Sequence, residues 1–337
     1  MKYQIKYNNN KSNYTSKNFG KKFNIINENE IKKICVIKFG GLGDTILTVP
    51  FFRTLRKYFP SARITFLCST NKLISEKLVD DFIIIPRRKG LKEDITQIIK
   101  FRKFEKQDFL FDITESTRSM ILSAIIPATM KVGFNHRGFE RFCYDAAINR
   151  SGYKFESDAF LDLLRAFEIN GDPLDFFMPE HEIKDAGPFV TFAIGSAMPT
   201  KNWPIKNYAE LADKLINQYP DIKIVIPIGP LEKEIETDFK NNCRNLDKII
   251  IAGPLEDVAG YLRKSLYFIG NDTGIRHIAI AYGVPTLGIL MASNVIRYSP
   301  AYISKRHFHF SMSEITVDAV FNKTVEELEK IKKFDIT

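Results

Sequence analysis

Residues 268–290 read FIGNDTGIRHIAIAYGVPTLGIL, and this stretch predicts the local architecture most directly. Apolar, strand-forming side chains precede a turn at residues 270–274. Apolar residues then recur at helical spacing until Gly283 and Pro285, which are typical of a helix end. A second apolar run follows at residues 286–290. The stretch therefore predicts a strand, a tight turn, a helix and another strand.

The GNDTG turn has two interpretations. The free N–H groups and the positive dipole end of the following helix favour an anion, and the two glycines allow a phosphate to approach closely. In the alternative interpretation the turn is an ordinary connection, in which Asp272 or Thr273 only caps the helix and His277 only packs. Spacing alone does not separate the two.

A similar pattern lies near the N-terminus, where a buried-strand pattern at residues 34–38 leads into FGGLGD at residues 39–44. A strand that ends in a glycine turn is the usual ligand end of an open α/β sheet. The dinucleotide fingerprint fails, because Ile46 stands where its third glycine is needed, and no GK[ST] phosphate loop is present. A nicotinamide enzyme is therefore disfavoured. Asp44 is expected to cap a helix with a local kink at Pro50.

Strand-like and helical stretches alternate along the rest of the chain, which predicts an α/β fold with doubly wound sheets. The break at residues 170–173 and the polar stretch at residues 179–188 indicate a linker between two domains. We therefore expect a flexible basic arm at 1–30, an N-terminal Rossmann-like domain at 31–180, a C-terminal Rossmann-like domain at 181–316 and a closing helix at 317–337.

The net charge of +9 is concentrated at one end of the chain. Residues 1–22 hold six lysines and no acidic residue, so the remaining chain carries only +3. This placement argues against a nucleic-acid partner and predicts a solvated tail or a peripheral tether to anionic lipid at the inner membrane. The four cysteines are widely spaced and no apolar run reaches the ~18 residues of a membrane span, so we expect a cytoplasmic protein.

The two glycine turns carry a resemblance. The pattern GNDTGxxHxAxAxGVPT and the run KICVIKFGGLGDTILTVPFFRTLRKYFPSARITFL resemble segments of the ADP-heptose:lipopolysaccharide heptosyltransferase family, glycosyltransferase family 9. The resemblance implies a GT-B fold, with two Rossmann-like domains facing a central cleft. It also implies a nucleotide-sugar donor on the C-terminal domain and a glycan or lipid-linked acceptor on the N-terminal domain. The chain departs from the family pattern at Ile275 and Arg276 and again after Leu290.

The resemblance also implies roles for particular residues. Asp44 corresponds to the catalytic base, and the segment GSAMPTKNWP corresponds to a loop that contacts the donor diphosphate through Ser196 and Lys201. Lys201 is thereby also expected to assist catalysis. The remaining expected donor contacts are Glu232, Asp272, Thr273, Gly274 and His277. The expected acceptor contacts are Gly41, Gly43 and Arg118.

The sequence has no DxD pair near a strand end, and His307 with His309 gives only two candidate ligands, so no metal site and no cofactor are predicted. We expect an inverting, metal-independent glycosyltransferase that moves a sugar, first of all a heptose from ADP-heptose, to a hydroxyl of a lipopolysaccharide-core or related glycan. Two alternatives stay open. One is a transferase with another nucleotide sugar or a protein acceptor, and the other is a non-catalytic nucleotide-sugar-binding module.

Overall fold

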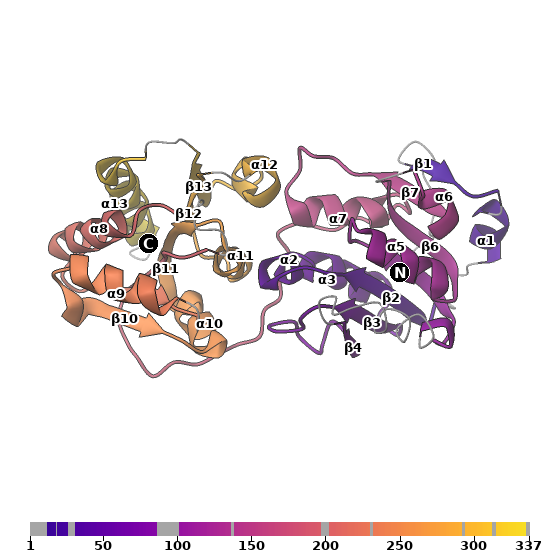
Figure 1. Ribbon diagram of the computed structural model, residues 1–337, viewed down its shortest axis with the longest axis horizontal. Coiled ribbons are helices and arrows are strands. Elements are labelled where there is room, and N and C mark those ends of the chain that lie inside the picture. Colours follow the sequence, from indigo (N-terminus) through magenta and orange to yellow (C-terminus); the bar gives the residue numbers. More distant parts are fainter. Residues whose placement is uncertain are drawn as a thin grey trace. The chain divides into compact units, whose positions relative to one another are not determined.

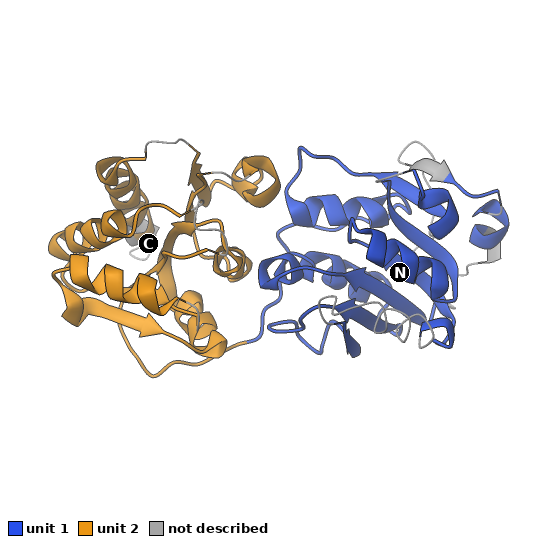
Figure 2. Cartoon of the chain, viewed as in Figure 1, with its two compact units in different colours: residues 1–179 blue, residues 180–337 orange. Residues whose placement is uncertain are grey.

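The computed structural model describes residues 12–17, 19–25, 31–85, 101–135, 138–196, 202–229, 232–291, 294–311 and 315–334. The chain divides into two compact units, residues 1–179 and residues 180–337 (Figure 2). Each unit is built around its own sheet (Figure 1).

The described part of the first unit contains a seven-stranded sheet. Its strands are β1 (Ser12–Thr15), β2 (Lys33–Lys38), β3 (Arg63–Cys68), β4 (Asp81–Ile84), β5 (Gln107–Asp112), β6 (Ala128–Asn135) and β7 (Ala146–Asn149). They lie in the order β1-β7-β6-β5-β2-β3-β4, and all pairs are parallel except β1 with β7. Without β1, this is the Rossmann order 3-2-1-4-5-6.

The helices of this unit are α1 (Phe19–Ile25), α2 (Leu42–Ile46), α3 (Val49–Tyr58), α5 (Thr117–Ile125), α6 (Glu140–Cys143) and α7 (Glu156–Arg165). One kinked helix was expected where α2 and α3 stand, and the structure instead shows two separate helices. Pro50 lies in the first turn of α3. A proline has no N–H to donate and its ring clashes with the carbonyl four residues earlier, here Ile46, which is the last residue of α2. The helix therefore breaks between Ile46 and Val49.

The expectation of a flexible N-terminal arm is wrong for residues 12–17 and 19–25. Strand β1 pairs antiparallel with β7, and Phe19 of α1 is buried. The Lys22 ammonium lies 2.8 Å from a carboxylate oxygen of Asp145, which directly precedes β7. Apolar burial and this ion pair outweigh the cost of ordering a polar segment. The other residues of the expected arm lie outside the described residues.

The described part of the second unit contains a six-stranded, wholly parallel sheet. Its strands are β8 (Phe189–Ala193), β9 (Lys223–Pro227), β10 (Ile249–Ala252), β11 (Ser265–Asn271), β12 (Thr286–Ile289) and β13 (His307–Phe310). The order β10-β9-β8-β11-β12-β13 is again 3-2-1-4-5-6. Two parallel-sheet, Rossmann-like domains are therefore present.

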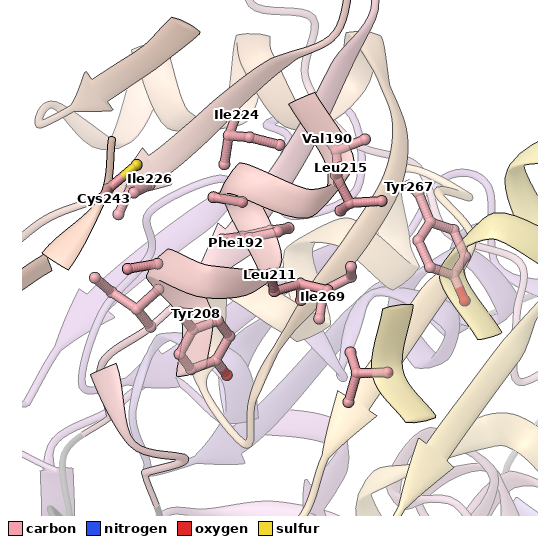
Figure 3. Close-up of a cluster of buried hydrophobic side chains, with 14 of the residues drawn as sticks. Val190, Phe192, Tyr208, Leu211, Leu215, Ile224, Ile226, Cys243, Tyr267 and Ile269 are labelled. Atoms are coloured by element: carbon pink, nitrogen blue, oxygen red, sulfur yellow. The ribbon is translucent and has the colours of Figure 1, made fainter. Parts of the chain in front are cut away.

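The α-helices of the second unit are α8 (Ile205–Gln218), α9 (Lys233–Asn242), α10 (Leu255–Lys264), α11 (Gly274–Ala281), α12 (Val295–Tyr298) and α13 (Val317–Phe334), with short 3₁₀ helices at Leu246–Lys248 and Pro300–Tyr302. Helix α8 places Tyr208, Leu211 and Leu215 on one face, at the spacing of successive helical turns. These side chains pack on Phe192 of β8 and Ile269 of β11 (Figure 3). Burying each such side chain contributes ~1.5–3 kcal/mol.

The C-terminal helix α13 packs on α8 and β11 of its own unit. Val320 and Leu328 are buried in the same core as Leu211 and Leu215. This helix therefore belongs to the fold of the second unit.

Candidate active site

The expected site loops lie at the topological switch point of each sheet. In the first unit, β2 and β5 are neighbours. From β2 the chain continues to β3, toward one edge of the sheet, and from β5 it continues to β6, toward the other edge. In the second unit, β8 and β11 have the same relation. Ligands of open α/β sheets bind outside the carboxyl ends of the strands at such points. The loops after these four strands are therefore the candidate binding surfaces.

The loop after β2 holds the Asp44 carboxylate in a folded-back position. Gly41 is the N-cap of α2, and its N–H donates to Asp44 Oδ2 at 3.0 Å. A Cβ on Gly40 would lie 2.6 Å from the Cβ of Asp44, so only glycine fits there. Asp44 was expected to be the N-cap, but it is the third residue of α2 because Gly41 begins the helical turn. Its side chain is 35% exposed, so the carboxylate remains accessible.

Arg118 lies at the same edge of the sheet as this loop. The N–H of Phe39, next after β2, donates to Thr114 Oγ1 at 2.9 Å, which joins the ends of β2 and β5. The Arg118 guanidinium stands 5.5 Å from the centre of the Phe39 ring. The expected acceptor contact Gly41 is exposed, but Gly43 is buried within α2 and offers no surface to an acceptor.

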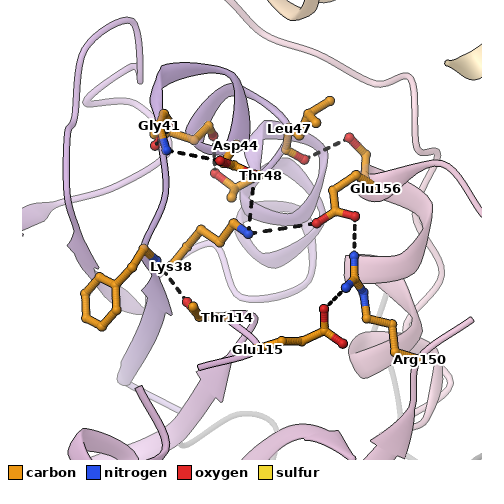
Figure 4. Close-up of polar contacts among 12 residues, drawn as sticks. Lys38, Gly41, Asp44, Leu47, Thr48, Thr114, Glu115, Arg150 and Glu156 are labelled. Atoms are coloured by element: carbon orange, nitrogen blue, oxygen red, sulfur yellow. Dashed lines mark hydrogen bonds and ion pairs between the residues drawn. The ribbon is translucent and has the colours of Figure 1, made fainter. Parts of the chain in front are cut away.

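Two charged groups behind this loop were not singled out from the sequence. Lys38, the last residue of β2, is almost completely buried and lies 3.8 Å from Asp44 Oδ1 (Figure 4). Asp112 ends β5 and is also buried, where it accepts hydrogen bonds from Tyr144 and Ser123. Burial raises the pKa of Asp112 to about 6, although these hydrogen bonds act to lower it. Asp112 is therefore inaccessible to a substrate, whereas Asp44 is partly exposed.

In the second unit, Asn271 fastens two loops together. Its Oδ1 accepts from the Trp203 N–H and from the Tyr208 hydroxyl, each at 3.0 Å, and its Nδ2 donates to the Ile194 carbonyl at 2.8 Å. Asn271 is the last residue of β11, and Ile194 follows β8. The Trp203 indole N–H also donates to the Ile315 carbonyl, so this tryptophan pins its loop to the core. The start of α11 is thereby held beside the end of β8.

Helix α11 begins at this junction with Thr273 as its N-cap. The Thr273 side chain makes no cap hydrogen bond, and Thr273 Oγ1 is buried without a hydrogen-bond partner in the described part of the protein. Asp272 and Gly274 are partly exposed on either side of it. Gly283 ends the helix with φ of +74°, which favours glycine. The N–H groups of a helix's first turn, left uncapped by the N-cap side chain, suit an anion with several oxygens.

His277 and Arg276 point into the second unit. His277 is buried and its ring centre lies 6.0 Å from that of Tyr298. Arg276 is completely buried, donates to the Tyr298 carbonyl at 2.8 Å, and lies against Gly288, where a Cβ would be 2.8 Å from its Nε. Burial lowers the pKa of Arg276 to about 10. Arg276, where the chain departs from the family pattern, therefore packs beneath the loop. Contact between His277 and the donor stays a prediction.

The loops after β8 and β9 bring Glu232 to the same edge. Its Oε2 accepts from the Gly229 N–H at 2.6 Å, and its Oε1 occupies the space that a side chain at Gly195 would need. Ser196, next in the chain, is partly exposed. Lys201 lies outside the described residues.

Within the described residues, no group of three or more His, Cys, Asp or Glu side chains is arranged to hold a metal ion. His307 Nδ1 lies 3.1 Å from the Thr286 hydroxyl, and His309 Nδ1 lies 3.3 Å from the Ser299 hydroxyl. Burial and the nearby Arg276 lower the pKa of His307 to about 3. These histidines therefore make structural hydrogen bonds. No helix in the described part of the chain combines the length and apolar content needed to cross a bilayer.

Comparison with known proteins assigns the chain to a family. The model of glycosyltransferase family 9 (heptosyltransferase) matches residues 99–327, which is more than half of the chain. The chain belongs to glycosyltransferase family 9. A curated relative, the lipopolysaccharide core heptosyltransferase OpsX of Haemophilus influenzae, is 24% identical over 80% of this chain and 82% of its own length.

Solved structures of the same family share the fold. The family 9 glycosyl transferase from Veillonella parvula superposes with a TM-score of 0.78 at 22% identity, over 90% of this chain and 99% of its own. The E. coli heptosyltransferase WaaC, solved with ADP-2-deoxy-2-fluoro heptose, gives a TM-score of 0.70 at 17% identity, over 88% of this chain and 99% of its own. The predicted GT-B class and the predicted glycosyltransferase activity of the heptosyltransferase type are confirmed.

Proposed function

We propose that this family 9 enzyme transfers a heptose from ADP-heptose to a hydroxyl of a lipopolysaccharide-core or related glycan acceptor, with inversion and without a metal ion. The observation that carries the proposal is the pair of switch-point loops. One presents an accessible carboxylate, Asp44, and the other presents the first turn of α11, where the N-cap Thr273 makes no side-chain cap hydrogen bond. The names of the relatives support the choice of substrates, because they include lipopolysaccharide heptosyltransferases and a complex with an ADP-heptose analogue.

The second unit would hold the donor. The diphosphate would accept hydrogen bonds from the N–H groups at the start of α11, beside the N-cap residue Thr273. Ser196 and Glu232 lie on loops at the same edge of the sheet and would contact the rest of the donor. Lys201 would add a positive charge as the diphosphate leaves. Lysine and helix N–H groups together supply the charge stabilisation for which other transferases use a cation.

The first unit would hold the acceptor. Asp44 would remove the proton from the acceptor hydroxyl, whose oxygen then attacks the anomeric carbon from the side opposite the diphosphate. The carbon–oxygen bond to the diphosphate breaks as the new glycosidic bond forms, and a single displacement of this kind inverts the anomeric configuration. Exposed Gly41 leaves room for the acceptor, and Arg118 would face its anionic groups.

The four free cysteines support a reducing, cytoplasmic setting. The lysine-rich N-terminal residues support peripheral contact with the anionic face of the inner membrane. Binding to vesicles containing anionic lipid should then weaken as salt rises.

The donor is tested by thermal unfolding with a panel of nucleotide sugars. ADP-heptose should raise the melting midpoint most, because a ligand that binds only the folded state stabilises it by mass action. A larger rise with a uridine or guanosine sugar would reject the proposed donor. Transfer should also continue in EDTA, and loss of transfer that Mg²⁺ restores would reject metal independence.

The base is tested with Asp44→Asn. Asparagine has the same size and retains an oxygen that can accept from the Gly41 N–H. Transfer from ADP-heptose should fall ~10²–10⁴-fold while the melting midpoint and ADP affinity stay close to wild type. Asp175→Asn, at a surface carboxylate of the same unit that pairs with Arg53, is the matched control and should leave transfer unchanged. Near-normal turnover by Asp44→Asn would show that the base lies elsewhere.

A further inference from the structure

We propose that Lys38 is a positioning residue for the catalytic base and that a chain of charges of alternating sign holds it in place. The inference rests on the proposed role of Asp44 as base. It adds that the orientation of the Asp44 carboxylate, and therefore turnover, depends on an ammonium group that no substrate touches.

Lys38 lies between two carboxylates (Figure 4). Its Nζ is 3.8 Å from Asp44 Oδ1 and 3.9 Å from Glu156 Oε1, and it stands 4.8 Å from the centre of the Phe160 ring. Only 6% of the Lys38 side chain is exposed. An ammonium at this depth is stable only with nearby negative charge, and the two carboxylates and the ring face provide it.

The far side of Lys38 is anchored by Glu156, the first residue of α7. Glu156 is completely buried and pairs with Arg150, which pairs in turn with Glu115 in the loop after β5 (Figure 4). The charges alternate in sign from Glu115 to Asp44. Separating a buried ion from its partner would cost the protein several kcal/mol of stability. Each charged side chain in the chain therefore restricts the position of the next one.

Asp44 is consequently held through both of its carboxylate oxygens. Oδ2 accepts from the Gly41 N–H at 3.0 Å, and Oδ1 faces the Lys38 ammonium. With the ammonium removed, the Gly41 N–H would be the remaining polar contact of the carboxylate among the contacts described above. General-base catalysis requires the base within hydrogen-bond reach of the acceptor hydroxyl, and a displacement of about 1 Å can lower the rate ~10²-fold.

A purely structural role for Lys38 makes a different prediction. If the ammonium only neutralised Glu156, its loss would lower stability and disturb the enzyme regardless of which residue stands at position 44. A positioning role requires that the effect of Lys38 on turnover disappear once the base is gone. A double-mutant cycle separates the two cases.

The experiment compares wild type, Lys38→Met, Asp44→Asn and the double variant, with ADP-heptose as donor and core-truncated lipopolysaccharide as acceptor. Lys38→Met should lower kcat ~10²-fold with ADP affinity unchanged, and should lower the residual rate of Asp44→Asn less than about 2-fold. Lys33→Met is the matched control, because Lys33 begins the same strand and pairs with Glu105 at the surface. The control should turn over at the wild-type rate.

Glu156 is left with one partner fewer in Lys38→Met, so the cycle is repeated with Lys38→Met/Glu156→Gln, which removes both charges. Lys38→Met could lower the rate by the same factor in the wild type and in Asp44→Asn, or it could leave kcat at the wild-type value. Either result would overturn the positioning role alone. An unchanged rate in Asp44→Asn would overturn the proposed base and this inference with it.

Discussion

Replacing Asn271 by alanine should destabilise the second unit and weaken donor binding together. The side chain makes three hydrogen bonds, with the Trp203 N–H, the Tyr208 hydroxyl and the Ile194 carbonyl. Asn271 and Tyr208 are completely buried, and Ile194 and Trp203 are at most 1% exposed. Alanine leaves all three partner groups without their bond and without access to water.

The expected cost follows from that count. Each buried polar group left unsatisfied costs ~1–3 kcal/mol, so the loss for three groups should be on the order of 3–9 kcal/mol. Domains of this size are stable by ~5–15 kcal/mol, so the variant should lose a large part of its stability. ADP affinity should fall as well, because Asn271 holds the start of α11 beside the loop after β8.

The assay uses the only tryptophan of the chain. Trp203 is buried in the core of the second unit, so its fluorescence reports unfolding of that unit in urea. Tyr208→Phe is the matched control, since it removes one of the three bonds and keeps the ring, and it should cost about 1 kcal/mol. The reasoning fails if Asn271→Ala loses no more stability than Tyr208→Phe, or if it binds ADP as tightly as wild type.

Three further predictions concern the first unit. Asp112 has a folded pKa of about 6 against ~3.9 unfolded, so its contribution to stability is complete below pH ~3.9 and is lost as the pH rises through 6. An asparagine side chain cannot ionise, so the Asp112→Asn variant should not show this loss of stability, which is on the order of 3 kcal/mol at pH 7 in the wild type. The melting midpoint of the variant should therefore depend less on pH. An unchanged pH profile would show that another group titrates. Gly40→Ala should displace the Asp44 carboxylate and lower the rate of transfer. Gly41→Ala should lower the rate less, because its Cβ would lie 3.9 Å from that carboxylate. Equal losses of rate would contradict the close contact between Gly40 and Asp44. Deleting residues 1–30 should lower the melting midpoint, because it removes β1 from the sheet, and an unchanged midpoint would show that this strand adds nothing.

Local patterns in the sequence were sufficient to predict both Rossmann-like units, because strand, turn and helix signals lie next to one another in the chain. Hydrogen bonding between distant segments was not visible in this way. Asn271 and Ile194 are 77 positions apart, and nothing in GNDTG shows which carbonyl the asparagine will meet. Lys38 likewise read as the polar end of a strand, since its partner Glu156 belongs to a helix far along the chain.

The other differences between the prediction and the structure lie at Pro50 and in the N-terminal segment. In both places the local sequence signal was present, but tertiary packing decided the structure that formed. Pro50 signalled a disturbed helix, but whether it kinks or breaks depends on what the flanking residues can contact. The hydroxyl of Ser157 in α7 donates to the Leu47 carbonyl at 2.8 Å, which satisfies a group that the broken helix leaves free. The polar N-terminal segment looked disordered because its few apolar residues, such as Phe19, find their partners only in the folded sheet.

Under the proposed function, the starts of α2 and α11 differ in how well they suit a phosphate. Helix α2 begins with its own carboxylate, because the Gly41 N–H already donates to Asp44, and this negative charge repels a phosphate. In helix α11 the side chain of the N-cap Thr273 makes no cap hydrogen bond. Free ADP should therefore compete with the donor alone and leave the acceptor side vacant. Product inhibition would then be relieved by raising the donor concentration but not by raising the concentration of the acceptor glycan.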